Sequence, residues 1–272
     1  MATLTHAIVA AEDAAPDKTI VFLHGILGSG ANWRTFARQL VAVRPAWRVV
    51  LVDLRKHGAS QDFGPPHTLA ACVNDLLELE KEIGRVDAVL GHSFGGKVAL
   101  DYVFARKDLD VAWVVDSAPG ARPDRRGSET TVQIVHMLDT LPERFPSREA
   151  FVEYVQSKGT DRSIAMWLAM NVRPTETGDY AMRVDVHALR ALLDDYFARD
   201  VWPVLEDPAR TTKVHLVAGG RSHVLDTAER ARAQRLAAGA PDRTWLHVVR
   251  DAGHWVHVDA PIELLELVVH YL

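Results

Sequence analysis

The chain contains a single cysteine, Cys72, among 272 residues. One thiol cannot form an intrachain disulfide, so the fold has to be held by packing and hydrogen bonds. Cys72 falls on the apolar side of a helical pattern that also includes Leu69, Val73 and Leu76. This position predicts a core residue and not a nucleophile.

Long apolar runs are also missing. No stretch approaches the 18 apolar residues of a membrane span, and the N-terminus lacks the basic start and long apolar core of a secretory signal. We therefore expect a cytoplasmic protein without stable membrane insertion.

Neither sign of charge dominates, because 31 Lys and Arg are interspersed with 36 Asp and Glu for a net charge of −5. A nucleic-acid footprint or a patch for anionic membranes would require a basic excess, so neither partner is predicted. The densest basic cluster, formed by Arg122, Arg125 and Arg126, contains Asp124 and is interpreted as a solvated loop.

Hydrophobic residues make up 48% of the chain, enough for one large α/β domain. Apolar runs of strand length, several rich in valine, occur at 19–23, 48–52, 87–90, 111–115, 213–217 and 245–249. Continuous apolar strands indicate a parallel sheet covered on both faces, that is, a mostly parallel, doubly wound α/β fold. Residues 4–9 predict an extra antiparallel edge strand.

Helical patterns separate these strands at 33–42, 68–83, 95–105, 227–237 and 261–271. Thr68 is the expected N-cap of the second helix, and Gly84 is expected to follow its end.

The alternation of strands and helices breaks after Asp116. Helical stretches at 131–138, 148–157, 164–170 and 186–196 predict a helical cap (117–207) inserted into an α/β core made of 1–116 and 208–272. Adaptable apolar side chains suit an acyl or aromatic pocket, and the expected substrate-binding residues are Leu27, Met137, Met166, Trp167, Met170 and Trp255. The alternative for any single cap residue is that it packs the cap helices together.

The segment Gly91-His92-Ser93-Phe94-Gly95 follows an apolar run and precedes a helical pattern. A serine framed as G-x-S-x-G in this context is typical of a nucleophile elbow, where glycines permit a tight strand-to-helix turn. The serine Oγ then projects above the sheet, and the helix N-terminus can stabilise an oxyanion. We therefore expect a serine hydrolase with Ser93 as nucleophile.

A second glycine turn, His24-Gly25-Ile26-Leu27-Gly28, follows the run 19–23 and suits an oxyanion loop. The backbone N–H groups of Ile26 and Phe94 are the expected oxyanion donors. The alternative is an ordinary glycine turn. His24, His57 and His92 are expected to shape turns through local hydrogen bonds.

The chain order serine, acid, histidine places the base near the C-terminus, where Gly253-His254-Trp255 follows the last strand. His254 is therefore the expected general base. The acid that holds its imidazole is Asp116, at the end of the strand after the nucleophile helix, or less favourably Asp226, which is also placed to cap the next helix. Ser222 occupies the turn that usually carries the acid and is expected to add a hydrogen bond.

Taken together, these motifs resemble the α/β-hydrolase fold family from about Thr19 to the end of the chain. The resemblance extends to the small serine carboxylesterase branch of bacterial acyl-ester esterases and mitochondrial abhydrolase relatives. It is carried by His24-Gly25-Ile26-Leu27-Gly28-Ser29 with Asn32-Trp33, by residues 53–60, by 91–97, by Asp116-Ser117-Ala118-Pro119, by Gly219-Gly220-Arg221-Ser222 and by Gly253-His254-Trp255. The resemblance implies Asp116 as acid and a serine at position 222.

The expected reaction is hydrolysis of a small-molecule carboxylic ester, or a thioester, through an acyl-enzyme. No metal or organic cofactor is expected, since no G-x-G-x-x-G or P-loop pattern follows a strand. The alternatives on the same machinery are carbon–carbon bond hydrolysis, lactone opening and perhydrolysis. An alternative of another class is a ligand sensor with little turnover, and the sequence carries no prediction of oligomeric state.

Overall fold

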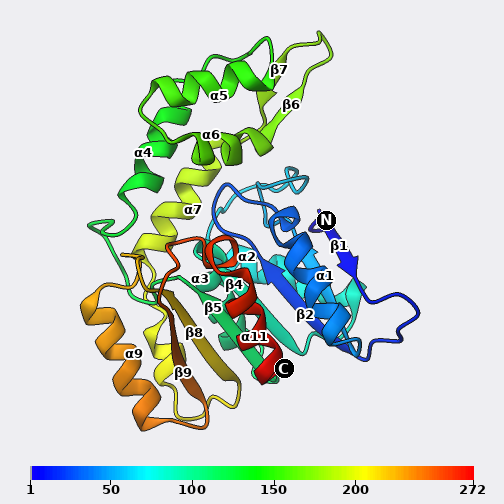
Figure 1. The fold of residues 1–272 in the computed structure, drawn as a ribbon, viewed down its shortest axis with the longest axis vertical. Coiled ribbons are helices and arrows are strands. Elements are labelled where there is room, and N and C mark those ends of the chain that lie inside the picture. Colours follow the sequence, from blue (N-terminus) through cyan, green and yellow to red (C-terminus); the bar gives the residue numbers. More distant parts are fainter. Residues whose placement is uncertain (1) are drawn as a thin grey trace.

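The computed structural model describes residues 2–272. Its main sheet has seven strands in the order β1-β3-β2-β4-β5-β8-β9 (Figure 1). All neighbours run parallel except β1, which pairs antiparallel with β3. The strands are β1 (His6–Val9), β2 (Lys18–Leu23), β3 (Trp47–Val52), β4 (Ala88–His92), β5 (Val111–Val115), β8 (Lys213–Gly219) and β9 (Thr244–Val249). This architecture confirms the predicted fold class and the antiparallel edge strand.

Helices cover both faces of the sheet. One core cluster joins Val21 and Leu23 of β2 to residues of α2 (Leu69–Ile83) and α3 (Phe94–Ala105). The other joins Ile20 and Phe22 of the same strand to residues of α1 (Arg34–Val43) and α11 (Pro261–Tyr271). Successive β2 residues point to opposite faces and all four are buried, which is why the strand reads as an unbroken apolar run.

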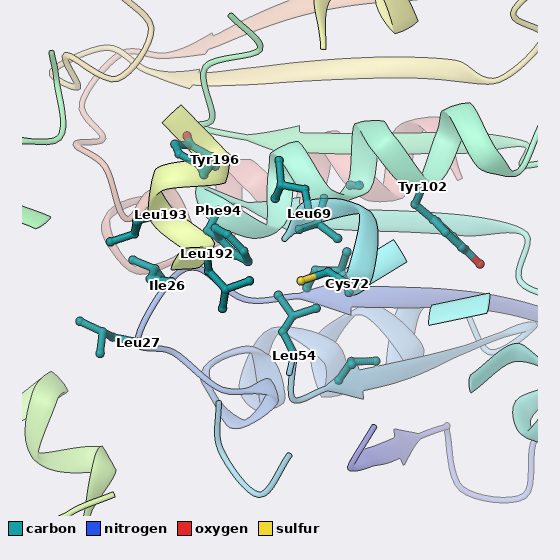
Figure 2. Packing of buried hydrophobic residues seen from close by; sticks show 14 of the residues in the cluster. Ile26, Leu27, Leu54, Leu69, Cys72, Phe94, Tyr102, Leu192, Leu193 and Tyr196 are labelled. Atoms are coloured by element: carbon teal, nitrogen blue, oxygen red, sulfur yellow. The ribbon is translucent and has the colours of Figure 1, made fainter. Parts of the chain in front are cut away.

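The predicted helix caps are present on α2. The Thr68 Oγ1 accepts a hydrogen bond from the Ala71 N–H at 3.2 Å, and Gly84 follows the last turn with φ +81°. Cys72 is fully buried on the same helix, beside Leu54 and Leu69 (Figure 2). Burial raises the pKa of its thiol far above the usual range, so the predicted core role is confirmed.

The chain between β5 and β8 holds further helices and a small hairpin, which Figure 1 shows extending beyond one end of the sheet. We call residues 117–207 the insertion. Its elements are α4 (Glu129–Leu138), α5 (Arg148–Ser157), α6 (Arg162–Leu168), the short 3-10 helix η2 (Ala169–Asn171), β6 (Val172–Pro174), β7 (Tyr180–Met182), α7 (Val186–Ala198) and α8 (Trp202–Glu206). Helices lie at all four predicted stretches, whereas the hairpin and α8 were not predicted.

The two ends of the insertion are hydrogen-bonded to each other. The Arg122 N–H donates to the Phe197 carbonyl at 2.7 Å, and the Val201 N–H donates to the Pro119 carbonyl at 2.9 Å. The prediction of a solvated Arg122 is wrong: its side chain is buried and its Nη2 lies 3.4 Å from Asp226 Oδ2.

Among residues 2–272, no helix is both long and apolar enough to cross a bilayer.

Candidate active site

Ser93 lies in a strained turn between β4 and α3. Its backbone has φ +53° and ψ −119°, a conformation that residues with a Cβ rarely adopt. A Cβ on Gly91 would lie 2.1 Å from the Gly95 carbonyl oxygen, and a Cβ on Gly95 would lie 2.5 Å from that of His24. The two glycines of the motif are therefore required by space, and the predicted strand–turn–helix context is confirmed.

Replacing Gly91 with alanine is expected to lower the free energy of unfolding by more than about 2 kcal/mol, because backbone must move to admit the methyl group. Urea denaturation measures the change. Gly239→Ala is the matched control, since no atom lies within 4 Å of a Cβ built at that helix end. Equal stability of the two variants would contradict this account of the turn.

Asp116 directly follows β5 and is completely buried. Its Oδ2 lies 2.7 Å from His254 Nδ1 and accepts a hydrogen bond from Ser222 Oγ at 2.5 Å, while its Oδ1 accepts from the Gly219 N–H at 3.0 Å. Because a carboxylate only accepts hydrogen bonds, this contact favours the His254 tautomer with the proton on Nδ1. The Nε2 atom is then free to accept a proton.

Asp226 has a different position. Its side chain accepts a hydrogen bond from the Glu229 N–H at 2.9 Å, so it caps α9 (Thr227–Gly239) as one reading of the sequence suggested. It also pairs with Arg122. The structure therefore brings Asp116, Ser222 and His254 into one hydrogen-bonded group and places Asp226 outside it.

Sheet pairing brings these residues to one edge. The Ser93 N–H donates to the Val115 carbonyl at 2.9 Å, and the Asp116 N–H donates to the Val217 carbonyl at 2.7 Å. Ser93, Asp116 and the Gly219 turn thus follow three adjacent parallel strands, β4, β5 and β8. This is the edge at which open α/β sheets carry their sites.

The loop after β2 packs against the serine. A Cβ on Gly25 would lie 3.3 Å from the Ser93 Cβ and 3.1 Å from His92 Nδ1. Ile26 follows in this loop, and Phe94 is the first residue of α3, where N–H groups have no partner within the helix. Both predicted donors therefore belong to segments that lie next to the serine.

Buried histidines hold these turns, as predicted. His24 Nε2 accepts from the Leu54 N–H at 3.0 Å and its Nδ1 donates to the Gly25 carbonyl at 2.7 Å. Burial lowers the pKa of His24 to about 4, so the ring is neutral near pH 7. The neutral ring can donate from Nδ1 and accept at Nε2 at the same time. His92 Nε2 donates to the His254 carbonyl at 2.9 Å, which fixes the backbone of the candidate base.

One contact to the loop after β2 was not predicted. Asn171, between α6 and β6, donates from Nδ2 to the Leu27 carbonyl at 2.9 Å. Leu27 has φ +62°, so the insertion holds a strained residue of the loop in place. No local pattern marks Asn171, because its partner lies far away in the sequence.

The expected pocket residues are spread over the insertion and the core. Leu27 is buried, Met137, Trp167 and Trp255 are half-buried, and Met166 and Met170 are 56% and 42% exposed. The Trp167 and Trp255 rings lie 6.0 Å apart and join α6 to the residue after His254. Figure 2 shows Leu192, Leu193 and Tyr196 of α7 beside Phe94 and Ile26. These three α7 side chains are buried and pack the insertion against the start of α3, and we call them the α7 wall.

Among residues 2–272, no group of three His, Cys, Asp or Glu side chains is arranged to hold a metal ion. The chemistry that these residues can perform is nucleophilic, with a serine in a strained turn and a histidine bonded to a buried carboxylate.

The parallel sheet, the serine turn and the His254–Asp116 pair are together the arrangement of an α/β hydrolase. Comparison with known proteins agrees: the sequence profile of the alpha/beta hydrolase family matches residues 20–267. The chain belongs to this family.

Individual relatives are similar over most of the chain. The sn-1-specific diacylglycerol lipase ABHD11 of Mus musculus is 32% identical over 260 residues, covering 93% of this chain and 80% of the relative. Esterase YbfF of Escherichia coli (strain K12) is 26% identical over 264 residues, covering 96% of both. A solved marine microorganism esterase superposes with a TM-score of 0.84 at 22% identity, covering 100% of both chains, and supports the fold.

Proposed function

We propose that this protein is a serine carboxylesterase in which Ser93 is the nucleophile, His254 the base and Asp116 the acid. The observation that carries the proposal is the 2.7 Å contact between His254 Nδ1 and the buried Asp116, beside a serine in a strained strand–helix turn. Similarity to a lipase and an esterase supports ester hydrolysis.

In the first half of the reaction, Ser93 Oγ attacks the ester carbonyl carbon and its proton passes to His254 Nε2. The negative charge on the carbonyl oxygen is stabilised by the N–H groups of Ile26 and Phe94. Asp116 stabilises the imidazolium. When the tetrahedral intermediate collapses, the carbon–oxygen bond of the ester breaks and the proton on His254 moves to the leaving alcohol.

In the second half, water attacks the acyl-enzyme with His254 again as base, and the carboxylic acid and free Ser93 are released. Ser222 Oγ donates to Asp116 Oδ2, the oxygen that also contacts His254 Nδ1, and the Gly219 N–H holds Oδ1, which together keep the carboxylate oriented toward the imidazole. Ser222 is in this scheme an auxiliary residue.

The insertion acts in this proposal as a cap over the site, with residues 1–116 and 208–272 as core. Leu27, Met137, Met166, Trp167, Met170 and Trp255 bind the acyl or alcohol group of a small to medium ester. A thioester would react by the same steps. A cytoplasmic location stays a prediction.

Steady-state hydrolysis of p-nitrophenyl esters from acetate to decanoate tests the proposal. We expect saturable turnover on short or medium chains and inactivation by a fluorophosphonate, with the adduct mapped to the peptide that contains Ser93. A protein that hydrolyses none of these esters and takes no label would contradict the esterase and favour a carbon–carbon hydrolase or a ligand sensor.

A further inference from the structure

Lys97 is a buried charged residue that the reaction scheme leaves unused. It lies on α3 one turn after Phe94, and only 1% of its surface is exposed. Lysine is almost never fully buried unless its charge has partners. Its Nζ donates to the carbonyl oxygens of Gly120 at 2.9 Å, Tyr196 at 2.8 Å and Arg199 at 2.9 Å. These bonds use all three protons of the ammonium group.

The three carbonyls belong to the two ends of the insertion. Gly120 lies just after β5, and Tyr196 and Arg199 lie at the end of α7. We call 119–122 and 196–201 the hinge segments. Because two backbone hydrogen bonds also join the hinge segments directly, the ammonium sits at the centre of a joint between the insertion and the core.

The end of α7 suits a cation. The Tyr196 carbonyl is among the last four of the helix, which have no partner within it, and the negative end of the helix dipole lies there. The Lys97 Nζ also lies 4.3 Å from the centre of the Tyr196 ring, within range of a cation–π contact.

The same face of α3 makes two further contacts with this region. Phe94 packs against Tyr196 with ring centres 5.9 Å apart, and Asp101 Oδ1 accepts from Arg199 Nη2 at 3.0 Å. Phe94, Lys97 and Asp101 are spaced i, i+3 and i+7, which puts them on one side of the helix. The helix α3, which begins beside Ser93, therefore also contacts the end of α7, where the chain leaves the insertion.

We propose that Lys97 is a positioning residue: the hydrogen bonds of its amino group fix both hinge segments to the nucleophile helix, and so hold the α7 wall at a set distance from Phe94. The kinetic consequence rests on the proposed esterase function. The rigidity of the hinge segments does not depend on the esterase function, and it can be measured without any turnover.

Hydrogen exchange of the native protein tests the hinge directly. Lys97→Met keeps a side chain of similar length but leaves three buried carbonyls without a donor. We expect the Arg122 and Val201 amides to exchange at least about tenfold faster at pH 7, while amides of β2 and β4 keep their rates. Lys107→Met, an exposed lysine just past α3, is the matched control with wild-type rates. Wild-type rates at both hinge amides in folded Lys97→Met would overturn the proposal.

Ester kinetics separate positioning from a general loss of folded protein. If the α7 wall moves, we expect the KM for p-nitrophenyl decanoate to rise at least about tenfold more than the KM for the acetate, because a long acyl chain extends further from Ser93 and meets the α7 wall in the proposed binding mode. A variant that merely folds less well lowers kcat for both esters by one factor and leaves both KM values alone, and that result would count against the proposal. If the wild type hydrolyses neither ester, the proposed function fails while the exchange experiment still decides the role of Lys97.

A measurement on the wild type covers the case in which Lys97→Met does not fold. Burial, together with the charge of Arg122, lowers the pKa of Lys97 to about 8 against the opposing charges of Glu229, Asp200 and Asp101. An open hinge exposes the amine to water, where its pKa is near 10.5. The open state then binds more protons than the closed state between these values, so opening becomes rarer as the pH rises.

We therefore expect hinge protection, corrected for intrinsic exchange, to increase from pH 8 to pH 10 by up to about tenfold per unit relative to amides of β2. The pKa of Lys97 in the native protein, followed by the NMR chemical shift of its Cε, sets the size of this change. Hinge protection that stays constant although this pKa differs from 10.5 would mean that opening does not release Lys97, and would overturn the proposal.

Discussion

Replacement of Ser93 by alanine is expected to lower kcat/KM for a p-nitrophenyl ester by at least about 10,000-fold. Without the hydroxyl, no acyl-enzyme forms, and the remaining rate comes from water in a site that still has its oxyanion donors. The alanine methyl group fits the turn, since Ser93 already carries a Cβ at φ +53°. The loss should therefore be one of chemistry and not of folding.

The measurement is initial-rate hydrolysis at matched protein concentration, with thermal unfolding to show that the variant is folded. Ser157→Ala, at the end of α5, is a control that should keep the wild-type rate. A Ser93→Ala protein with a tenth or more of the wild-type kcat/KM would rule out Ser93 as the nucleophile.

Asp116→Asn is expected to lower kcat by about 10,000-fold while the protein stays folded. The Gly219 N–H needs an acceptor at the Oδ1 position, so the amide oxygen takes that place and the amide nitrogen takes the place of Oδ2. It then donates to His254 Nδ1. The imidazole proton is forced onto Nε2, the atom that has to receive the Ser93 proton.

Asp226→Asn is the matched control, because asparagine caps a helix about as well as aspartate. It should keep kcat within about threefold of the wild type. The assignment of the acid would be reversed if Asp226→Asn lost several orders of magnitude and Asp116→Asn kept its rate. Stopped assays in the steady state are sufficient for so large a difference.

The parallel sheet was predictable because its central strands are buried on both faces and so read as nearly continuous apolar runs. The residues that interrupt this pattern include Arg48 of β3, Lys18 and Lys213 at strand starts, and the histidines His215 of β8 and His247 of β9. The candidate site followed from chain order, since Ser93, Asp116 and His254 each come just after a strand. Sequence position alone did not decide between Asp116 and Asp226 as the acid, and the observed hydrogen bonds of Asp116 favour Asp116.

Other features depend on partners that are remote in the sequence. The strands β6 and β7 have three residues each, one of them Pro174, so they show no readable alternation. Arg122 resembled a loop arginine because Asp124 lies among the nearby arginines, yet its side chain is buried and pairs with Asp226, the N-cap of α9. Lys97 gave no signal beyond its place in the glycine motif, because all of its acceptors are backbone atoms of the hinge segments.

The buried Cys72 makes this chain a ready background for spectroscopic labelling. Its thiol is enclosed in the core and stays protonated, so maleimide and methanethiosulfonate reagents do not reach it in the native state. A cysteine placed at an exposed position of α6, such as Met166, would be the one reactive thiol of the protein. A spin label or dye there would report the movement of α6 in solution without replacement of the native cysteine.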